Sequence, residues 1–373
     1  MRVPVRVMDE GPRMLYCSGM RMKKKETRPG RATLKDIARV VGVSPTAVSL
    51  ALNGKGSLTE DLRQRIKNTA ASLDYSPNPA ARILRGVRSN AVSVIINYFN
   101  NPFFRDFLLG LEEVTDKAGI SYSVSQTHDD LAKEQALVRK AAEQGADGLI
   151  VLNCSNEYVH LQAVSDTFAI PIVLISHTLE DRFAAVQADN VKGGRMATEH
   201  LLGLDERPVF HLAGPLGKSG IANRKLGFMQ AIAGARPGVD AEALCFPVEG
   251  LTAAAGYKGM KDVCAKHTPP FGLFVTNDEV ALGVLTYCRH HSLCFPEDVA
   301  VVGFSDIDLL ETMDIPLTSV RIPQHRMGGI AANTLLDLIA HPENRLCPPI
   351  LTLPVSLIVR ESTVGKRTAS NRH

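Results

Sequence analysis

The sequence of 373 residues has no run of 18 apolar residues, and charged side chains interrupt its first residues. Crossing a bilayer takes about 20 consecutive apolar residues, so no membrane-spanning helix is expected. The apolar core of a secretory signal peptide is also missing near Met1. We therefore expect the protein to stay in the cytoplasm.

Cysteine pairs and catalytic motifs are missing as well. The seven cysteines are scattered, none stands in a Cys-x-x-Cys pair, and no histidine falls at zinc-finger spacing. This pattern favours free thiols in a reducing compartment over disulfides or a metal site. Neither a Gly-x-Ser-x-Gly elbow nor a His-Glu-x-x-His pair occurs. We expect no enzymatic activity, no metal and no cofactor.

One segment is close to a phosphate-binding loop. Gly217-Lys218-Ser219 follows a predicted strand, but Leu212 stands where that motif requires its first glycine. Nucleotide hydrolysis is therefore not expected.

The charges divide the chain into two unlike parts. Residues 1–90 carry 18 Lys and Arg against 7 Asp and Glu, whereas residues 91–373 carry 24 against 32. A basic front on an acidic body is typical of a protein that binds nucleic-acid phosphates.

Residues 33–73 contain three short segments with helical periodicity. The first segment begins after the N-cap residue Thr33 and ends at Gly42. Its apolar residues lie on one face. The second begins with Ser44 as N-cap and Pro45 at the first helical position. These apolar residues are Leu34, Ile37, Ala38 and Val41 in the first segment, and Val48 and Leu52 in the second.

The third segment follows Thr59 and buries a stripe from Leu62 to Leu73. Two helices joined by a tight glycine turn are typical of a helix-turn-helix motif. The alternative is a three-helix bundle that binds no nucleic acid, and the charge distribution favours DNA.

This stretch resembles the headpiece of the lactose-repressor family of bacterial transcription regulators. The order and spacing of the shared residues match over about fifty residues. They are Thr33-Leu34, Asp36-Ile37-Ala38, Gly42-Val43-Ser44, Val48 to Asn53, Tyr75, Pro77-Asn78, Ala81-Arg82 and Leu84.

The resemblance implies a DNA-binding domain over residues 33–78 and a hinge helix over residues 79–89 that orders only on DNA. Leu84 would be the apolar wedge that enters the minor groove. Ser44 and Asn53 would contact phosphates, and exposed residues of the second helix would reach base edges. The full set expected at DNA is Thr33, Ser44, Pro45, Thr46, Ser49, Leu50, Asn53, Ala81 and Leu84.

Residues 1–32 and 364–373 fit no regular element and are expected to be disordered. The basic run in the first of these segments would add weak, non-specific DNA affinity. Three translation starts stay open for this segment, at Met1, Met20 and Met22.

From Ala91 onward, short β-rich runs alternate with amphipathic helices in two successive series. Such alternation predicts parallel sheets with helices on both faces. Two α/β halves resemble the periplasmic-binding-protein fold that this family uses as its sensor. We expect the sensor over residues 90–363. Its first lobe would comprise about 91–189 and 321–350, and its second about 190–320 and 351–363.

Ligands of such folds bind at the carboxyl ends of strands, in the crevice between the lobes. Arg224 and Asp278 match pocket positions of the family, and together they would suit vicinal hydroxyls, which both donate and accept hydrogen bonds. The residues expected at the effector are Phe103, Phe104, Asn153, Ser155, Arg224, Leu251, Asp278 and Asp306.

The resulting hypothesis is a DNA-binding transcription repressor whose operator affinity is set by a small metabolite, a sugar or a related polyhydroxylated compound, with nucleosides left open. Two-fold symmetry of a homodimer predicts a pseudo-palindromic operator in double-stranded DNA. The sequence leaves open whether the protein is a dimer or a tetramer. It also leaves open whether the metabolite releases the protein from DNA or recruits it to DNA. The alternative function is a solute-binding receptor of the same fold without DNA binding.

Overall fold

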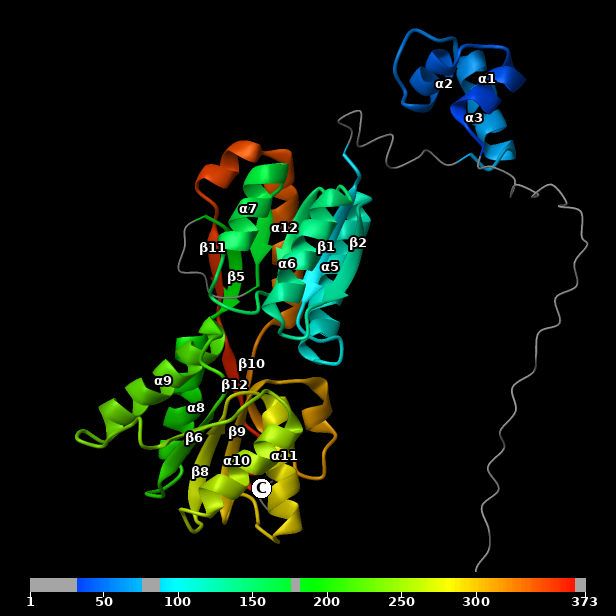
Figure 1. Cartoon of the computed structure of the whole chain (residues 1–373). Coiled ribbons are helices and arrows are strands. Elements are labelled where there is room, and N and C mark those ends of the chain that lie inside the picture. Colours follow the sequence, from blue (N-terminus) through cyan, green and yellow to red (C-terminus); the bar gives the residue numbers. More distant parts are fainter. Residues whose placement is uncertain (1–31, 76–87, 176–181, 366–373) are drawn as a thin grey trace, which may run out of the picture. The chain divides into compact units, whose positions relative to one another are not determined.

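A computed structural model describes residues 32–75, 88–175 and 182–365 of the chain (Figure 1). These residues form two compact units, a three-helix headpiece and a larger α/β unit. The basic extension and the hinge residues 79–87, with Ala81 and Leu84, lie outside the described residues.

The headpiece consists of α1 (Leu34–Val41), α2 (Pro45–Leu52) and α3 (Glu60–Ser72), which confirms the three predicted helices. Gly42 ends α1 in the left-handed conformation, with φ of 80°, and its N–H donates to the carbonyl of Ala38. Because L residues adopt this conformation at a cost, glycine suits this turn.

One small apolar core holds the three helices together. Ile37 from α1, Val48 and Ala51 from α2, and Ile66 from α3 are completely buried. The inward positions were predicted from helical spacing, except that Ala51 rather than Leu52 is the second buried residue of α2.

The larger unit contains two six-stranded sheets. The first has the strand order β11-β5-β4-β3-β1-β2, and every pairing in it is parallel. The strands of this sheet are β1 (Ala91–Ile96), β2 (Ser121–Gln126), β3 (Gly148–Val151), β4 (Ile172–Leu174), β5 (Ala184–Ala188) and β11 (Ile350–Leu353). The helices that accompany it are α5 (Phe103–Ala118), α6 (Leu131–Glu143), α7 (Val159–Phe168) and α12 (Gln324–Ala340), followed by η2 (Pro342–Leu346).

The second sheet has the order β12-β10-β9-β8-β6-β7, and only the edge strand β12 runs antiparallel to its neighbour. Its strands are β6 (Val209–Ala213), β7 (Cys245–Pro247), β8 (Phe271–Val275), β9 (Val299–Ser305), β10 (Thr318–Arg321) and β12 (Ser356–Ile358). The accompanying helices are α8 (Asn190–Leu202), α9 (Ser219–Ala235), α10 (Ala253–Cys264), α11 (Asp278–His290), η1 (Asp308–Glu311) and α13 (Glu361–Val364).

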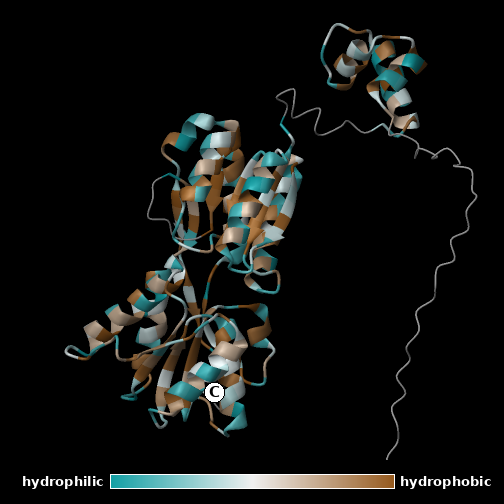
Figure 2. Ribbon diagram, viewed as in Figure 1, coloured by the Kyte–Doolittle hydropathy of each residue, from teal (hydrophilic) through white to brown (hydrophobic). Residues whose placement is uncertain are grey.

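Hydrophobic residues concentrate in the strands, and hydrophilic ones on the outer faces of the helices (Figure 2). This distribution fits a parallel sheet, whose strands are covered on both faces and therefore carry continuous apolar runs. Within the described ranges, every helix is too short or too polar to cross a bilayer.

The chain passes between the two lobes three times. The passages follow β5 at Asp189, β10 before α12, and β11 before β12. The third passage corrects one expected boundary. Residues 351–353 pair with β5 as part of β11, so they belong to the first lobe and not to the second.

Candidate functional site

Helix α2 presents the residues that were predicted to read DNA. Val48 and Ala51 face the core, so the opposite face of α2 is turned to solvent. Pro45 and Thr46 are exposed there, and Leu50 retains 38% of its surface. An exposed apolar side chain on such a helix suits contact with a thymine methyl group.

Hydrogen bonds fix the ends of these helices. The Ser44 hydroxyl accepts from the N–H of Ala47 at 3.1 Å, which confirms its N-cap role. Thr33 donates its backbone N–H and its hydroxyl to the carboxylate of Asp36. The side-chain amide of Asn53 donates to the carbonyl of Ser49 at 2.7 Å.

Most of the basic excess lies outside the folded headpiece. Residues 32–75 carry six Lys and Arg against four Asp and Glu, whereas residues 1–31 carry nine against three. Much of the positive charge at this end of the chain therefore lies in the segments that adjoin the three helices.

A cavity of about 160 Å³ lies between the two lobes, at the carboxyl ends of the strands. It is smaller than the ~300–1,000 Å³ typical of sites for drug-sized ligands, which favours a small metabolite. The lining residues from the first lobe and its crossings are Asn97, Asn101, Phe103, Phe104, Leu152, Asn153, Ile175, Gln187, Ala188, Ile322 and Met327. Those from the second lobe are Asn190, Lys218, Ser219, Gly220, Ile221, Arg224, Leu251, Asn277 and Ser305.

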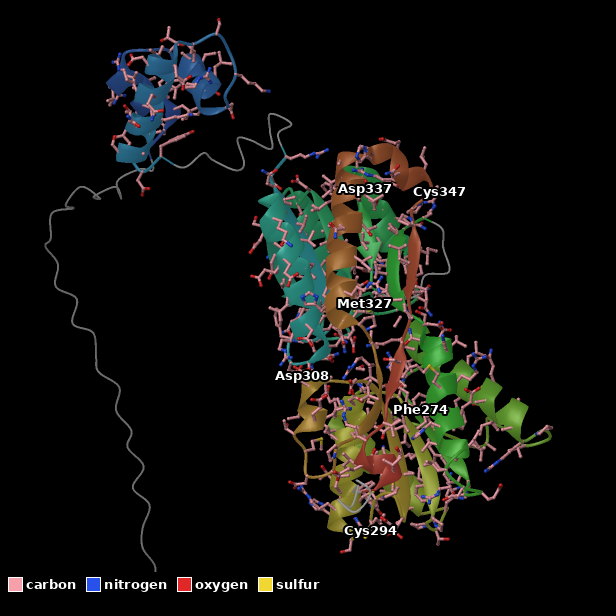
Figure 3. All side chains as sticks on the ribbon, turned by 180° about the vertical axis from the view of Figure 1, so that it is seen from behind. Phe274, Cys294, Asp308, Met327, Asp337 and Cys347 are labelled. Carbon is pink, nitrogen blue, oxygen red and sulfur yellow. The ribbon has the colours of Figure 1, made fainter. Side chains whose placement is uncertain are left out.

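Five of the predicted effector residues line this cavity: Phe103, Phe104, Asn153, Arg224 and Leu251. The rings of Phe103 and Phe104 meet edge to face, with centroids 5.1 Å apart. Met327 lies at the start of α12, where the first lobe approaches the second (Figure 3).

Asp278 is buried and does not line the cavity. Its carboxylate accepts from the Ser319 hydroxyl at 2.7 Å and from the N–H of Ile307 at 3.1 Å. Burial raises its pKa to about 6, although these hydrogen bonds lower it. The expected pairing of Arg224 with Asp278 around a ligand's hydroxyls is therefore not found, because this carboxylate is already bonded within the lobe.

Asp306 and Ser155 are also absent from the lining. Arg321 and Arg360 both donate to the Asp306 carboxylate, at 2.6 and 2.5 Å, so this buried group joins β10 to the C-terminal segment. The hydroxyl of Ser155 accepts from the N–H of Glu157, and its carbonyl accepts from the side chain of Asn153. Both residues are therefore bonded within their own lobes.

Most of the polar lining groups that the sequence interpretation missed are side-chain amides, and the others are Lys218, Ser219 and Ser305. The missed amides, which line the cavity together with the predicted Asn153, are Asn97, Asn101, Gln187, Asn190 and Asn277. Asn277 is the N-cap of α11 and accepts from the N–H of Val280. The positions of Asn97 and Asn277 in the sequence were a usable signal. Asn97 directly follows the last residue of β1, and Asn277 lies two residues after the last residue of β8.

Arg224 projects from α9 and is held from three sides. Its Nε donates to Asn190 Oδ1 at 2.9 Å, one terminal nitrogen donates to the Thr276 carbonyl at 2.6 Å, and its Cζ lies 3.9 Å from the centre of the Phe304 ring. Burial lowers its pKa to about 10, which nearby Asp278 opposes. The guanidinium therefore remains charged at neutral pH.

The position of Arg224 depends on close contact between two helices. A Cβ at Gly194 of α8 would lie 2.2 Å from the carbonyl oxygen of Arg224, and one at Gly227 of α9 would lie 2.1 Å from that of Val191. Only glycine permits backbones to approach so closely, so these two positions fix the distance of α9 from α8.

A helix-turn-helix headpiece in one chain with a two-lobed cavity domain defines a class of ligand-responsive DNA-binding regulators. Two family models match accordingly: the bacterial regulatory proteins of the lacI family over residues 33–78, and a periplasmic-binding-protein-like domain over residues 198–363. The chain belongs to the lacI family, which consists of transcription regulators.

Relatives of similar length support this assignment. The chain is 30% identical over 339 residues to the transcriptional repressor PurR of Glaesserella parasuis, covering 89% of this chain and 98% of the relative. It is 26% identical to the ribose operon repressor of Haemophilus influenzae, with the same two coverages.

Solved structures agree on the fold. The regulator CelR in complex with cellobiose is 27% identical, with a TM-score of 0.68 over 89% of this chain and 100% of that one. A lac repressor dimer bound to operator is 22% identical, with a TM-score of 0.78, and the match covers 90% of this chain and 99% of that one.

Proposed function

We propose that this protein is a homodimeric transcription repressor of the cytoplasm that responds to a small metabolite. The single observation that carries the proposal is the interlobe cavity in a chain that also has a helix-turn-helix headpiece. A solute-binding receptor is not favoured, because it would have no use for the headpiece.

Helix α2 would enter the major groove of a pseudo-palindromic operator. Thr46, Ser49 and Leu50 would specify bases, and the first turn at Pro45 would approach the base edges. Ser44 and Asn53, with Thr33 at the start of α1, would contact phosphates. Ala81 and Leu84, outside the described residues, would act at the minor groove as the family resemblance implies.

The effector would bind between Arg224, Leu251 and the Phe103-Phe104 pair, with the cavity amides as hydrogen-bonding partners. Relatives named for ribose and complexed with cellobiose support a polyhydroxylated metabolite. Asparagine and glutamine amides both donate and accept, which suits hydroxyl groups.

The ligand would act by a population shift between lobe arrangements. Because both lobes contribute lining residues, a ligand binds best in the arrangement that brings both walls to it. It can change DNA affinity only through its differential affinity for the two arrangements. The hinge residues 79–89 would transmit the change to the headpiece.

The test uses the full chain and an operator-like palindromic DNA fragment. A thermal-shift screen of sugars, polyols and purines finds a ligand, since binding to the native state raises its melting temperature. Arg224→Ala should weaken the ligand's effect on DNA affinity about tenfold or more, because charged hydrogen bonds are lost. Operator binding without ligand should stay unchanged.

The matched control is Lys258→Ala, which removes an exposed cation of the same lobe. It should leave both ligand response and operator binding intact. A full ligand response in Arg224→Ala would refute the cavity assignment. Failure to bind any palindromic fragment at low salt, where phosphate contacts are strongest, would refute the DNA-binding role.

A further inference from the structure

The charge balance of the interlobe cavity suggests more about the effector. Among the described residues that line it, two are cations, Lys218 and Arg224, and none is a carboxylate. The other polar lining groups are amides and hydroxyls. This inference rests on the proposed function and concerns the chemical class of its ligand.

Arg224 lacks a direct counter-charge. Its described contacts are the Asn190 amide oxygen, the Thr276 carbonyl and the Phe304 ring, and all three are neutral. Among the described residues, no carboxylate forms an ion pair with this guanidinium, although the charge of the buried Asp278 partly offsets the effect of burial on its pKa. Removing a cation from water without pairing it costs free energy, which an incoming anion would recover.

Lys218 adds a second cation at the cavity. It is 22% exposed and donates to the Asp129 carboxylate of the first lobe at 2.6 Å. Its pairing uses one of three ammonium N–H groups, so two remain for a ligand. Lys218 also stands directly before α9, whose first residues Ser219, Gly220 and Ile221 line the cavity.

The helix therefore adds a favourable electrostatic contribution. Helix α9 spans 17 residues, and the positive end of its dipole points to the cavity where Lys218 stands. The Gly217-Lys218-Ser219 segment is not a complete phosphate-binding loop, but its position contributes positive charge to the cavity. It places a cation and a helix terminus beside the same space.

We propose that the effector carries an anionic group, a phosphate or a carboxylate, which binds between Lys218 and Arg224. A neutral sugar would satisfy the amides and leave both cations without an added counter-charge. The remainder of the ligand would contact the amides and the Phe103-Phe104 pair.

The first experiment uses inorganic phosphate as the probe. The melting temperature of the full chain is measured in phosphate and in chloride at equal ionic strength. Phosphate should raise it in the wild type, and this gain should be clearly smaller in Lys218→Gln and in Arg224→Gln. Lys258→Gln, a control on the exposed surface, should keep it.

The comparison with these variants separates the cavity from the basic headpiece, which also attracts anions. An equal melting temperature in the two salts overturns the proposal. A phosphate gain that is as large in both Lys218→Gln and Arg224→Gln as in the wild type also overturns it. Lys218→Gln guards against the case in which Arg224→Gln simply weakens the fold.

The second experiment compares ribose, ribonate and ribose 5-phosphate by calorimetry. At least one of the two anions should bind about tenfold or more tightly than ribose, as expected for added charged hydrogen bonds, and Lys218→Gln should reduce this ratio. Comparing the affinities of ribonate and ribose 5-phosphate shows whether a carboxylate or a phosphate is preferred. Ribose binding as tightly as both anions overturns the inference.

A DNA-binding readout distinguishes this failure from failure of the proposed function. If ribose alone binds and changes operator affinity, the proposed regulatory function is supported and the proposal of an anionic effector is refuted. If no palindromic DNA is bound under any condition, the proposed function fails, while the calorimetric ratio still decides the ligand class.

Discussion

His211 is the residue whose environment has the most direct consequence for stability. It lies on β6, fully buried, and its ring stacks on those of Phe274 and Phe228 with centroids 4.6 and 5.2 Å away. Phe274 marks this region within the second lobe (Figure 3). One ring nitrogen bonds the Phe274 carbonyl at 3.0 Å, and Nε2 has no partner among the described residues.

We predict that this histidine makes the protein less stable as the pH falls below neutrality. Burial lowers its pKa to about 3 from the ordinary 6.5, so the unfolded chain binds a proton that the folded chain refuses. Its stabilising contribution is therefore complete above pH 6.5 and is lost as the pH falls toward 3. Between these two pH values, His211 should contribute about 1.4 kcal/mol per pH unit to the slope of the unfolding free energy against pH.

Urea unfolding of the wild type and His211→Gln between pH 4 and 7 measures this contribution. The difference between their slopes isolates His211, because Asp278, with its raised pKa, contributes the opposite slope to both proteins. His290→Gln, at an exposed position of the same lobe, is the control and should follow the wild type. Parallel slopes for wild type and His211→Gln would contradict the assignment.

At the same scale, the limits of sequence interpretation are physical. The position of Asn153 after a strand and the family resemblance of Arg224 correctly placed both residues at the cavity. Position after a strand could not separate Asn277 from Asp278, because both follow β8 and the direction of each side chain depends on how α11 begins. Asn277 caps that helix beside the cavity, whereas Asp278 turns toward Ser319 in the core.

At the scale of elements, the α8–α9 pair decides where the Arg224 guanidinium stands. We predict that Gly227→Ala destabilises the protein by about 1–3 kcal/mol, since the added methyl would overlap the Val191 carbonyl and force the helices apart. Displaced with α9, Arg224 should also bind ligand less tightly. Chemical unfolding and the phosphate shift in melting temperature measure the two effects.

Gly234→Ala is the matched control on the same helix. A Cβ at this position would meet nothing within 4 Å. The substitution should therefore raise stability by up to about 1 kcal/mol, because alanine is the better helix former. Equal effects of the two substitutions would show that helix contact is not the cause.

Elements were easier to predict than the junctions between them. The alternation of apolar runs and amphipathic helices located the helices and most strands, because burial on both faces leaves a strong pattern in the sequence. The assignment of β11 to the first lobe was missed. Its residues Ile350 and Leu351 are exposed at the sheet edge, so no buried pattern distinguishes this strand from the crossing that follows.

At the scale of the whole α/β unit, two ion pairs between described residues join the lobes. Arg105 of α5 donates to Asp308 of η1, and Lys218 bonds Asp129. Asp308 is seen at the junction of the lobes (Figure 3). Because each pair has one member in each lobe, both favour the arrangement in which the lobes are close.

We predict that Asp308→Asn opens the junction more often without unfolding either lobe. The Arg105–Asp308 pair is exposed, so its loss should raise the population of open molecules by up to about fivefold. Hydrogen exchange of ligand-free protein, followed by mass spectrometry, should accelerate in both residues 103–106 and residues 308–311. The less exposed Asp129 should give a larger effect when changed to asparagine.

Exchange on both sides of the junction is the decisive observation. If only residues 308–311 accelerate in Asp308→Asn, the substitution has loosened η1 locally and the pair does not link the lobes. Glu249→Gln breaks an exposed pair within the second lobe and should leave both segments unchanged. In 1 M salt, where screening acts over about 3 Å, wild-type exchange should approach that of Asp308→Asn. A metabolite that bridges both walls would act in the opposite direction, by adding contacts that exist only when the lobes are close.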